Sequence, residues 1–192
     1  ALDGIEARLA GLSALRSRPA GLLRITANRT AAQAILYPKL ARLMTDWPEI
    51  TVEVSVDQAF VDIVEHRFDA GVRLGESVAR DMIAVRIGPD LRMCVAGAPG
   101  YFARAGRPET PHALTGHACI NLRLPSLGGL YAWEFERDGR PLNVRVEGRF
   151  TSNDPDQIVA AAADGLGLCC LPVDHLAPLL ADGRLQSVLD DW

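Results

Sequence analysis

The sequence predicts an α/β fold made of two lobes, and three observations support this prediction. Residues 22–74 read as strand, helix, strand, helix and strand in turn, which is typical of a mostly parallel sheet covered by helices. Residues 92–185 read as a second block of the same kind. The stretch Phe60–Glu76 ends an apolar strand at Arg73, where the chain opens onto a surface. Because ligands bind at the carboxyl ends of strands in open α/β sheets, we expect a pocket around this strand end.

The composition is that of an ordinary globular protein. The chain has 192 residues, 48% of them hydrophobic, and a formal net charge of −4 at pH 7. This length allows one large domain or two small ones with a substantial core. The acidic balance argues against a free-standing nucleic-acid binder, since such proteins are usually basic.

The cysteines and the apolar runs indicate a reduced compartment. None of the four cysteines forms a CxxC pair, and all lie in strand-like apolar runs, so we expect buried thiols without a metal or redox role: Cys94, Cys119, Cys169 and Cys170. There is no apolar run of 18 residues and no signal-peptide pattern at the N-terminus. We therefore expect a cytoplasmic protein that does not enter a membrane.

Residues 1–17 are predicted to form a helix of their own. The apolar side chains recur at the spacing of a coiled-coil seam: Leu2, Ile5, Leu9 and Leu12. Pro19 and Gly21 end the pattern. A helix this short is marginal alone, so its apolar stripe is expected to meet another chain or its own domain, the partner chain being favoured.

The first lobe begins with a strand at Leu22–Ala27 and a polar loop at Asn28–Thr30. A helix follows, with apolar side chains on one side: Leu36, Leu40, Leu43 and Met44. Pro38 is expected to kink this helix or shift its axis, and Trp47-Pro48 ends it. The next strand, Thr51–Val56, places its three valines on one face.

The stretch after that strand combines a short helix with the strand end named first. Phe60, Val61, Ile63 and Val64 are spaced along one side of a helix that runs to His66. The strand that follows reaches Arg73 and Leu74.

The sequence from position 83 onward contains several shorter elements. We expect strands at Ile83–Ile87, Leu91–Ala96, Cys119–Leu122, Tyr131–Glu136 and Asn143–Phe150, and short helices at Pro99–Ala105 and Pro111–Thr115. Asp138-Gly139 is a strong hairpin signal between two of these strands.

A helix with clear start signals follows. Asp154 suits the N-cap, Pro155 the first helical position, and Gln157 completes a capping-box pattern. The helix is expected to end at Gly165. A strand at Gly167–Leu171, a helix at Val173–Ala181 and a strand at Leu185–Leu189 complete the block.

Enzyme signatures are absent from the sequence. It contains no GxSxG, GxxxxGK[ST] or HExxH motif. Gly165-Leu166-Gly167 follows a helix and precedes a strand, the reverse of a dinucleotide-binding turn. The four histidines lack carboxylate or cysteine partners at ligand spacing. We expect neither catalysis nor a cofactor or metal.

Two polar helix starts are better candidates for ligand binding. The N-terminus of a helix offers free N–H groups and a partial positive charge. One start lies at Asn28–Thr30 and the other at Ser152–Asp154. Simple capping is the plainer interpretation of each, but one start in each lobe favours a shared cleft. Asp154 already places a carboxylate at its helix end.

The residues from position 20 onward resemble the effector-binding region of LysR-type transcriptional regulators. The segment FVDIVEHRFDAGVRLGE matches a family pattern, and the likeness continues through CVAGAPGYFARAGRPETPHALTGHACI and SNDPDQIVAAAADGLGLCCLP. Each segment is moderately specific, and their order and spacing together are strong.

The resemblance implies a periplasmic-binding-protein-like fold of type 2, with two α/β lobes joined by crossing hinge strands. It assigns residues 1–18 to the end of a linker helix, 19–91 to lobe I, 92–185 to lobe II and 186–192 to a return segment. In such regulators a small-molecule effector binds between the lobes of a homodimer or homotetramer. A winged helix-turn-helix domain, absent from this chain, contacts DNA.

The resemblance also points to site residues. Thr30 stands where the family uses Ser or Thr to hold the effector, with Asn28 and Arg29 in the same loop. The other predicted effector-binding residues are Val72, Arg73, Leu74, Arg123, Ser152, Asn153 and Asp154. Val95–Gly97 and Cys170–Pro172 are expected near the hinge crossings. The helix Phe60–His66 is expected near a subunit interface, where it would link pocket and partner.

One departure and one alternative remain. Family members usually continue past the Asp191-Trp192 ending by about a strand and a helix, so we expect this end to be either truncated or disordered. If that strand is absent, a sheet edge of lobe I is exposed and invites pairing with another chain. The alternative function is a solute-binding protein of a transport system, which shares the fold. It would need an export signal and would not need the apolar stripe of residues 1–17.

Overall fold

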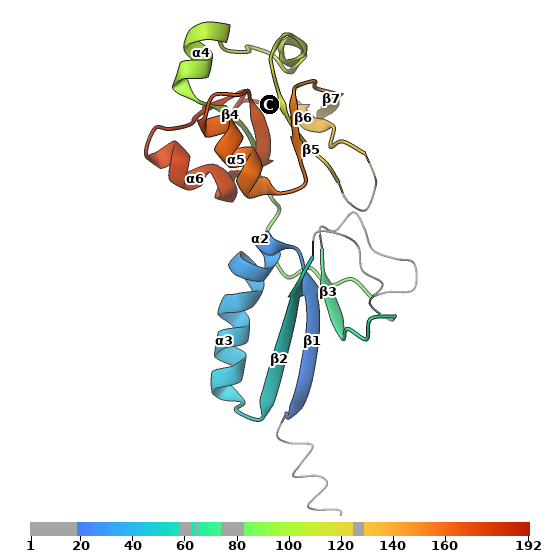
Figure 1. Cartoon of the computed structure of the whole chain (residues 1–192). Coiled ribbons are helices and arrows are strands. Elements are labelled where there is room, and N and C mark those ends of the chain that lie inside the picture. The colour runs from blue at the N-terminus through green and yellow to red at the C-terminus, as the bar shows by residue number, and fades with distance from the viewer. Residues whose placement is uncertain (1–18, 58–62, 64, 74–82, 125–128) are drawn as a thin grey trace, which may run out of the picture. The chain divides into compact units, whose positions relative to one another are not determined.

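Two units make up the chain, residues 1–89 and 90–192. Figure 1 shows their helices and strands along a computed structural model. The structure describes residues 19–57, 63, 65–73, 83–124 and 129–192. The lobe boundaries given above stay predictions.

The sheet of the first unit has three parallel strands in the order β2-β1-β3. These strands are β1 (Gly21–Ala27), β2 (Ile50–Val56) and β3 (Ala70–Val72). Ala27 aligns with Val56 on one side and with Val72 on the other, so all three strands end at one edge. The parallel sheet predicted for this lobe is confirmed.

One helical run follows β1, and its hydrogen bonding changes twice. It consists of α2 (Arg29–Ala31), a π-helical turn η1 (Ala32–Leu36) and α3 (Tyr37–Asp46). Pro38 lies in the first turn of α3, where its missing N–H interrupts the i→i−4 ladder. The break expected at Pro38 therefore takes the form of a π-helical turn before it. Trp47 donates its N–H to Leu43 and ends the run, as predicted.

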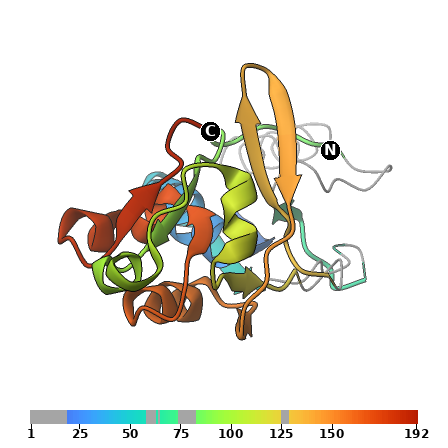
Figure 2. The ribbon, with the colours of Figure 1, turned by 90° about the horizontal axis from the view of Figure 1, so that it is seen from above.

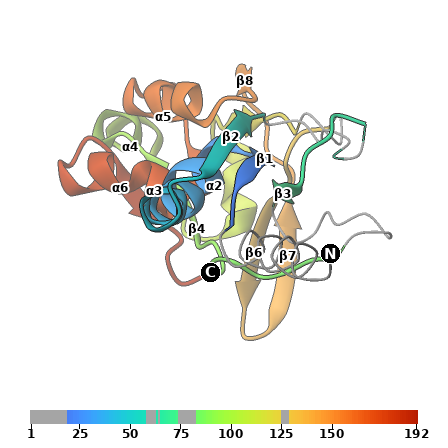
Figure 3. The same ribbon diagram turned by 90° about the horizontal axis from the view of Figure 1, so that it is seen from below.

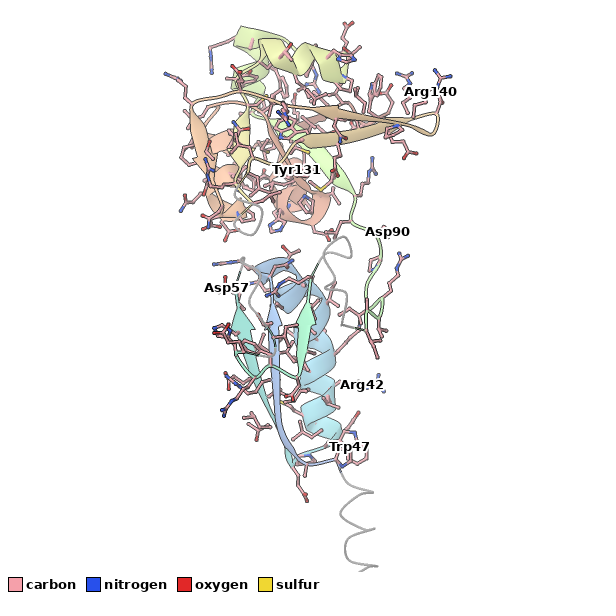
Figure 4. The ribbon with its side chains drawn as sticks, turned by 90° about the vertical axis from the view of Figure 1, so that its right-hand side faces the viewer. Arg42, Trp47, Asp57, Asp90, Tyr131 and Arg140 are labelled. Atoms are coloured by element: carbon pink, nitrogen blue, oxygen red, sulfur yellow. The ribbon has the colours of Figure 1, made fainter. Side chains whose placement is uncertain are left out.

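The core of the first unit lies between this run and one face of the sheet (Figure 4). It contains Ile25, Ala27, Ala31, Ala32, Leu36 and Leu40, with Val52 and Val72 packed against it. Val54 and Val56 share the face of Val52 but are 38% and 53% exposed. The helical run thus leaves the outer part of β2 uncovered.

Arg24 fastens a turn to the other face of the sheet. Its guanidinium donates to both carboxylate oxygens of Glu53, at 3.1 and 3.0 Å, and to the carbonyls of His66 and Arg67. It also lies 5.1 Å from the ring centre of Phe68. The exposed Arg24–Glu53 ion pair alone contributes little to stability. The contacts of Arg24 with His66, Arg67 and Phe68 together hold the turn against the sheet.

The helix predicted at Phe60–His66 lies mostly outside the described residues. Glu65, His66 and Arg67 form a turn. The strand predicted at Ile83–Ile87 is wrong, because this segment has no strand structure and pairs with no strand of the described part. Ile83 is 96% exposed and Val85 73%. An alternating apolar pattern cannot form a strand without a neighbour to share its hydrogen bonds.

The second unit contains one antiparallel sheet, one parallel pair and one hairpin. The sheet has the order β10-β4-β9, formed by β10 (Gln186–Val188), β4 (Met93–Gly97) and β9 (Cys169–Pro172). Strand β5 (Ile120–Leu122) pairs in parallel with β8 (Phe150–Ser152). Cys119 forms a bridge with Leu168, which brings β5 beside β9.

The hairpin joins β6 (Trp133–Arg137) to β7 (Arg140–Val144) and extends beyond its neighbours (Figures 2 and 3). Asp138 and Gly139 have φ values of 54° and 72°, so the predicted tight turn is confirmed. The single strand predicted at Asn143–Phe150 is wrong. The chain forms two strands there, because β7 pairs with β6 whereas β8 pairs with β5.

The helices of this unit match their predictions closely. They are α4 (Pro99–Ala105), the 3-10 helix η2 (Pro111–Gly116), α5 (Pro155–Ala163) and α6 (Val173–Ala181). One core contains Trp133, Leu114 and Leu168, and a second lies beneath α5 and α6 around Ile158 and Leu176. Strands β4 and β9 contribute to both cores.

Gly148 is required by a close approach of two backbone segments. A Cβ atom at this position would collide with the carbonyl oxygen of Cys119, which is backbone and cannot rotate away. Gly116 offers a matched control, since a Cβ there would meet nothing within 4 Å.

We predict that Gly148→Ala lowers the free energy of unfolding of the second unit by about 1–3 kcal/mol, the usual cost of forcing an extra methyl into packed structure. Gly116→Ala should change it by less than about 1 kcal/mol, the usual helical difference between these residues. Chemical denaturation monitored by tryptophan fluorescence measures both. Equal stability of the two variants would contradict the close approach.

Candidate functional site

The first candidate site lies at the edge where the three parallel strands of the first unit end. Asp57 follows β2 and donates its N–H to the carbonyl of Ala27 at 3.0 Å. Figure 4 shows Asp57 at this end of the unit and Trp47 at the opposite end. Asn28 follows β1, and its Oδ1 accepts the N–H of Ala31 at 2.8 Å, so the predicted helix start is confirmed. Arg73 follows β3.

Arg73 is held against the sheet by two acceptors. Its Nη2 donates to the hydroxyl of Thr26 at 2.9 Å, and its Nη1 donates to the carbonyl of Val72 at 2.9 Å. Partial burial lowers the pKa of the Arg73 guanidinium, and the charge of Asp57 acts in the opposite direction. The guanidinium keeps its charge at any physiological pH, since an arginine pKa lies far above 7. It is therefore a fixed cation at the strand ends.

Most of the effector-binding residues predicted for the first lobe lie at the strand-end edge of the first unit. Asn28, Arg29 and Thr30 begin the helical run, and Val72 aligns with Ala27 immediately before them. Thr30 is half-buried and Arg29 exposed. Leu74 lies outside the described residues. Whether these residues hold an effector stays a prediction.

The second candidate site lies at the carboxyl ends of β5 and β8. Leu122 aligns with Ser152, and Arg123 donates its backbone N–H to the carbonyl of Ser152 at 2.9 Å. The side-chain groups of Ser152, Asn153 and Asp154 precede α5 directly. The pairing thus brings Arg123 beside the start of α5, although 29 positions separate it from Ser152.

The cap of α5 differs in one respect from the predicted capping box. Asp154 accepts the N–H of Asp156 at 3.0 Å, as expected of an N-cap. Gln157, however, accepts the hydroxyl of Ser152 at 3.1 Å, and that hydroxyl accepts the N–H of Asp154. The Ser152 hydroxyl thus accepts the Asp154 N–H that the capping-box pattern assigned to the Gln157 side chain.

Three polar residues near these edges were not predicted from the sequence. Thr26 is fully buried, and Asn121 is 3% exposed with no hydrogen-bond partner for its Oδ1 in the described structure. Asp57 lies at the end of β2 beside Arg73. A polar residue inside an alternating apolar strand, as at Thr26 and Asn121, is the signal that could have identified the first two.

The segments predicted near the hinge are neighbours in one sheet. Val95 pairs with Cys170, and Ala96 pairs with Cys169, across β4 and β9. These residues are buried. A hinge function for them stays a prediction.

All four cysteines are free and buried, as predicted. Burial raises the pKa of the Cys94 thiol to about 11 and those of Cys119 and Cys169 to about 12, and it raises that of Cys170 as well. A thiol reacts and binds metals as the thiolate, so these groups are inert near neutral pH. No group of three His, Cys, Asp or Glu side chains among the described residues could hold a metal ion.

Both edges therefore offer hydrogen-bonding and charged side chains. Arg73 and Arg123 supply guanidinium groups, and Asp57 and Asp154 supply carboxylates. Such groups recognise a polar molecule. Within the described part of the chain, no helix combines the length and the apolar character needed to cross a membrane.

The comparisons with known proteins identify the class. Residues 16–192 match the family model described as LysR substrate binding domain. The chain thus belongs to the LysR family of transcriptional regulators, as a substrate-binding domain, and the predicted periplasmic-binding-protein-like fold of type 2 is confirmed.

Individual relatives agree with this class. The chain is 49% identical over 190 residues to a putative transcriptional regulator of Pseudomonas aeruginosa, covering 99% of this chain and 62% of the relative. It is 42% identical over 191 residues to the HTH-type transcriptional regulator PgrR of Escherichia coli, covering 100% and 64%. The chain thus spans less than two thirds of these relatives.

Solved structures support the fold. The full-length Vibrio cholerae virulence activator AphB matches with a TM-score of 0.76 and 24% identity, over 99% of this chain and 65% of that one. The regulatory domain of CrgA from Neisseria meningitidis matches with a TM-score of 0.69 and 22% identity, over 89% and 82%. At these identities the likeness concerns the fold alone.

We predict that no cysteine of the native protein reacts with a thiol reagent such as DTNB at pH 8, whereas all four react in denaturant. Ellman absorbance at 412 nm measures the number of reactive thiols. Fast reaction of one or more thiols in the native state would contradict the burial described above.

The raised thiol pKa values also predict a pH dependence of stability. The folded state keeps each thiol proton above the ordinary pKa of about 8.5, where the unfolded chain loses it. The stability contribution is complete below that pH and is lost as the pH rises towards 11, by up to about 1.4 kcal/mol per thiol and pH unit. Replacing Cys94 and Cys169 by Ala should make this loss less steep in urea denaturation.

Proposed function

We propose that the chain is the ligand-sensing domain of a transcriptional regulator and binds a small-molecule effector through the strand-end edges of both units. The observation that supports this most is that each unit, independently, gathers polar side chains and a helix start at the carboxyl ends of parallel strands. This is where α/β proteins bind ligands. The effector would lie between the two lobes, as the family fold implies.

The chemistry of the two edges suggests the class of effector. Arg73 is held in place by Thr26 and Val72, and Arg123 begins the segment after β5. Guanidinium groups suit carboxylate or other anionic groups, because they donate two parallel hydrogen bonds. We therefore propose a polar effector with at least one anionic group.

Signal transmission would follow from differential binding. The effector shifts the balance between two arrangements of the protein only by its difference in affinity for them. In the whole regulator, these arrangements would be those of a homodimer or homotetramer that contacts DNA through a winged helix-turn-helix domain. Such a regulator would work in the cytoplasm. The relatives are named as transcriptional regulators, so no catalytic role is proposed.

Thr30→Ala tests the site. A thermal-shift screen of small polar metabolites would first identify a ligand, since binding to the folded state stabilises it by about 2.7 kcal/mol at 100 times Kd. We expect Thr30→Ala to weaken that ligand roughly tenfold, the effect of losing one hydrogen bond of about 1.4 kcal/mol. Isothermal titration calorimetry measures the change.

Thr45→Ala is the matched control. Thr45 lies near the other end of the same helical run, and its hydroxyl donates to the carbonyl of Ala41. Its removal should leave the affinity unchanged. If Thr30→Ala binds the ligand as tightly as Thr45→Ala, Thr30 does not hold the effector.

A further inference from the structure

The π-helical turn η1 (Ala32–Leu36) interrupts the helical run of the first unit between α2 and α3. Tyr37 donates its N–H to the carbonyl of Ala32, five residues earlier, whereas an α-helix would use the carbonyl four residues earlier. Such turns are rare and frequently occur at functional positions. The run thus contains one residue more than an α-helix joining the same two ends would need.

The extra residue sets the direction in which the helix start points. Ala31 and Leu36 both lie in the core, although they are five positions apart. In a regular α-helix they would point about 140° apart, since each residue turns the helix by about 100°. If the turn became α-helical without losing a residue, residues 28–30 would rotate by roughly 100° relative to α3. Ala31 would then leave the core, which removes only one methyl group from it.

Pro38 explains why the π-helical register is adopted. It lies in the first turn of α3 and has no N–H to donate. In the α-helical register its ring would meet the carbonyl of Ala34, four residues earlier, and the wider turn relieves this contact. The π register thus gains the core contact of Ala31 and avoids the proline, and the α register gains regular hydrogen bonds. These opposing effects make two registers of the same segment accessible.

Two contacts join this part of the run to the last residues of the first unit. The Nζ of Lys39 donates to the carbonyl of Ile87 at 3.0 Å. Ile35, within the π-helical turn, packs so closely on Gly88 that a Cβ atom there would lie 2.8 Å from its δ-methyl group. The first unit ends at Pro89. The π-helical turn therefore touches the segment through which the chain passes into the second unit.

We propose that the π-helical turn is a two-register switch, which couples the strand-end edge to the segment that ends the first unit. A change of register rotates residues 28–30 at that edge and moves Ile35 against Gly88, because the turn links both. A change that favours one register at either place is therefore transmitted to the other. The switch goes beyond effector binding and operates whether or not the edge binds the proposed effector.

Deleting Ala34 tests whether the turn holds an extra residue. Ala34 is exposed, and its deletion should give a regular α-helix whose two ends keep their directions. We expect a melting temperature within about 4 °C of the wild type by circular dichroism. Deleting Ala41 is the matched control, because it lies in regular α3 and its loss turns Leu43 out of phase with Leu40. This control should lower the melting temperature by about 5 °C or more. Equal losses from the two deletions would overturn the proposal.

Gly88→Ala tests the coupling, because its methyl group presses on the end of the Ile35 side chain. In amide NMR spectra we expect this substitution to shift the resonances of residues 28–30. The same substitution in the Ala34-deleted protein should shift them at least threefold less, because the shortened turn has no second register. Gly116→Ala, whose methyl group meets nothing within 4 Å, should shift them in neither background. Equal shifts from Gly88→Ala in both backgrounds, or none in the wild type, would overturn the proposal.

These measurements need no effector, so the switch and the proposed function can fail separately. If Gly88→Ala shifts residues 28–30 only while the π-helical turn is intact, the switch is supported even where no polar metabolite binds. That result would count against the effector proposal alone. If a polar metabolite stabilises the wild type but Gly88→Ala acts equally in both backgrounds, the switch is overturned and the effector proposal stands.

Discussion

Parallel pairing is the constraint on which the rest of this structure depends. Strand β1 pairs with β2 over seven residues and with β3 over three, and this register stops all three strands at one edge. The same holds for β5 and β8 in the second unit. The helical run begins directly after β1, and α5 begins shortly after β8, so each edge also receives a helix start whose first N–H groups have no partner within the helix. Asn28 and Asp154 occupy these starts as caps. The polar residues at each strand-end edge therefore follow from the strand pairing and from the need to cap a helix, whether or not a ligand binds there.

The packed cores of both units contain polar side chains and thiols whose burial disfavours their polar or charged forms. In the first unit the helical run covers part of one face of the sheet. On the other face Arg24 pairs with Glu53 and holds a turn through two carbonyls. Thr26 can therefore remain fully buried, because Arg73 satisfies its hydroxyl. In the second unit, two apolar cores flank β4 and β9 and keep all four thiols protonated. Packing thus fixes the positions of these buried groups in both units.

Much of this fold follows from local sequence signals, and the exceptions share a cause. The hairpin turn at Asp138-Gly139, the cap at Asp154 and the break at Pro38 are each decided by one or two residues, so they were predictable. The segment Ile83–Ile87 has the pattern of a strand, yet a strand also needs a neighbour, which a local pattern does not reveal. Likewise, Arg123 and Ser152 were both predicted as site residues, but only the pairing of β5 with β8 brings them together. Thr26 and Asn121 can be recognised in the sequence as polar residues inside apolar strands, but how deeply they are buried depends on packing across the sheet.

We propose that the polar edges of the two units bind the same small-molecule effector. Amide chemical-shift changes in a titration with an effector test this most directly. Our account predicts that the amides of Asn28 to Thr30 and those of Ser152 to Asp154 shift together, saturate, and give the same Kd. Shifts confined to one of these segments, or two different Kd values, would contradict it.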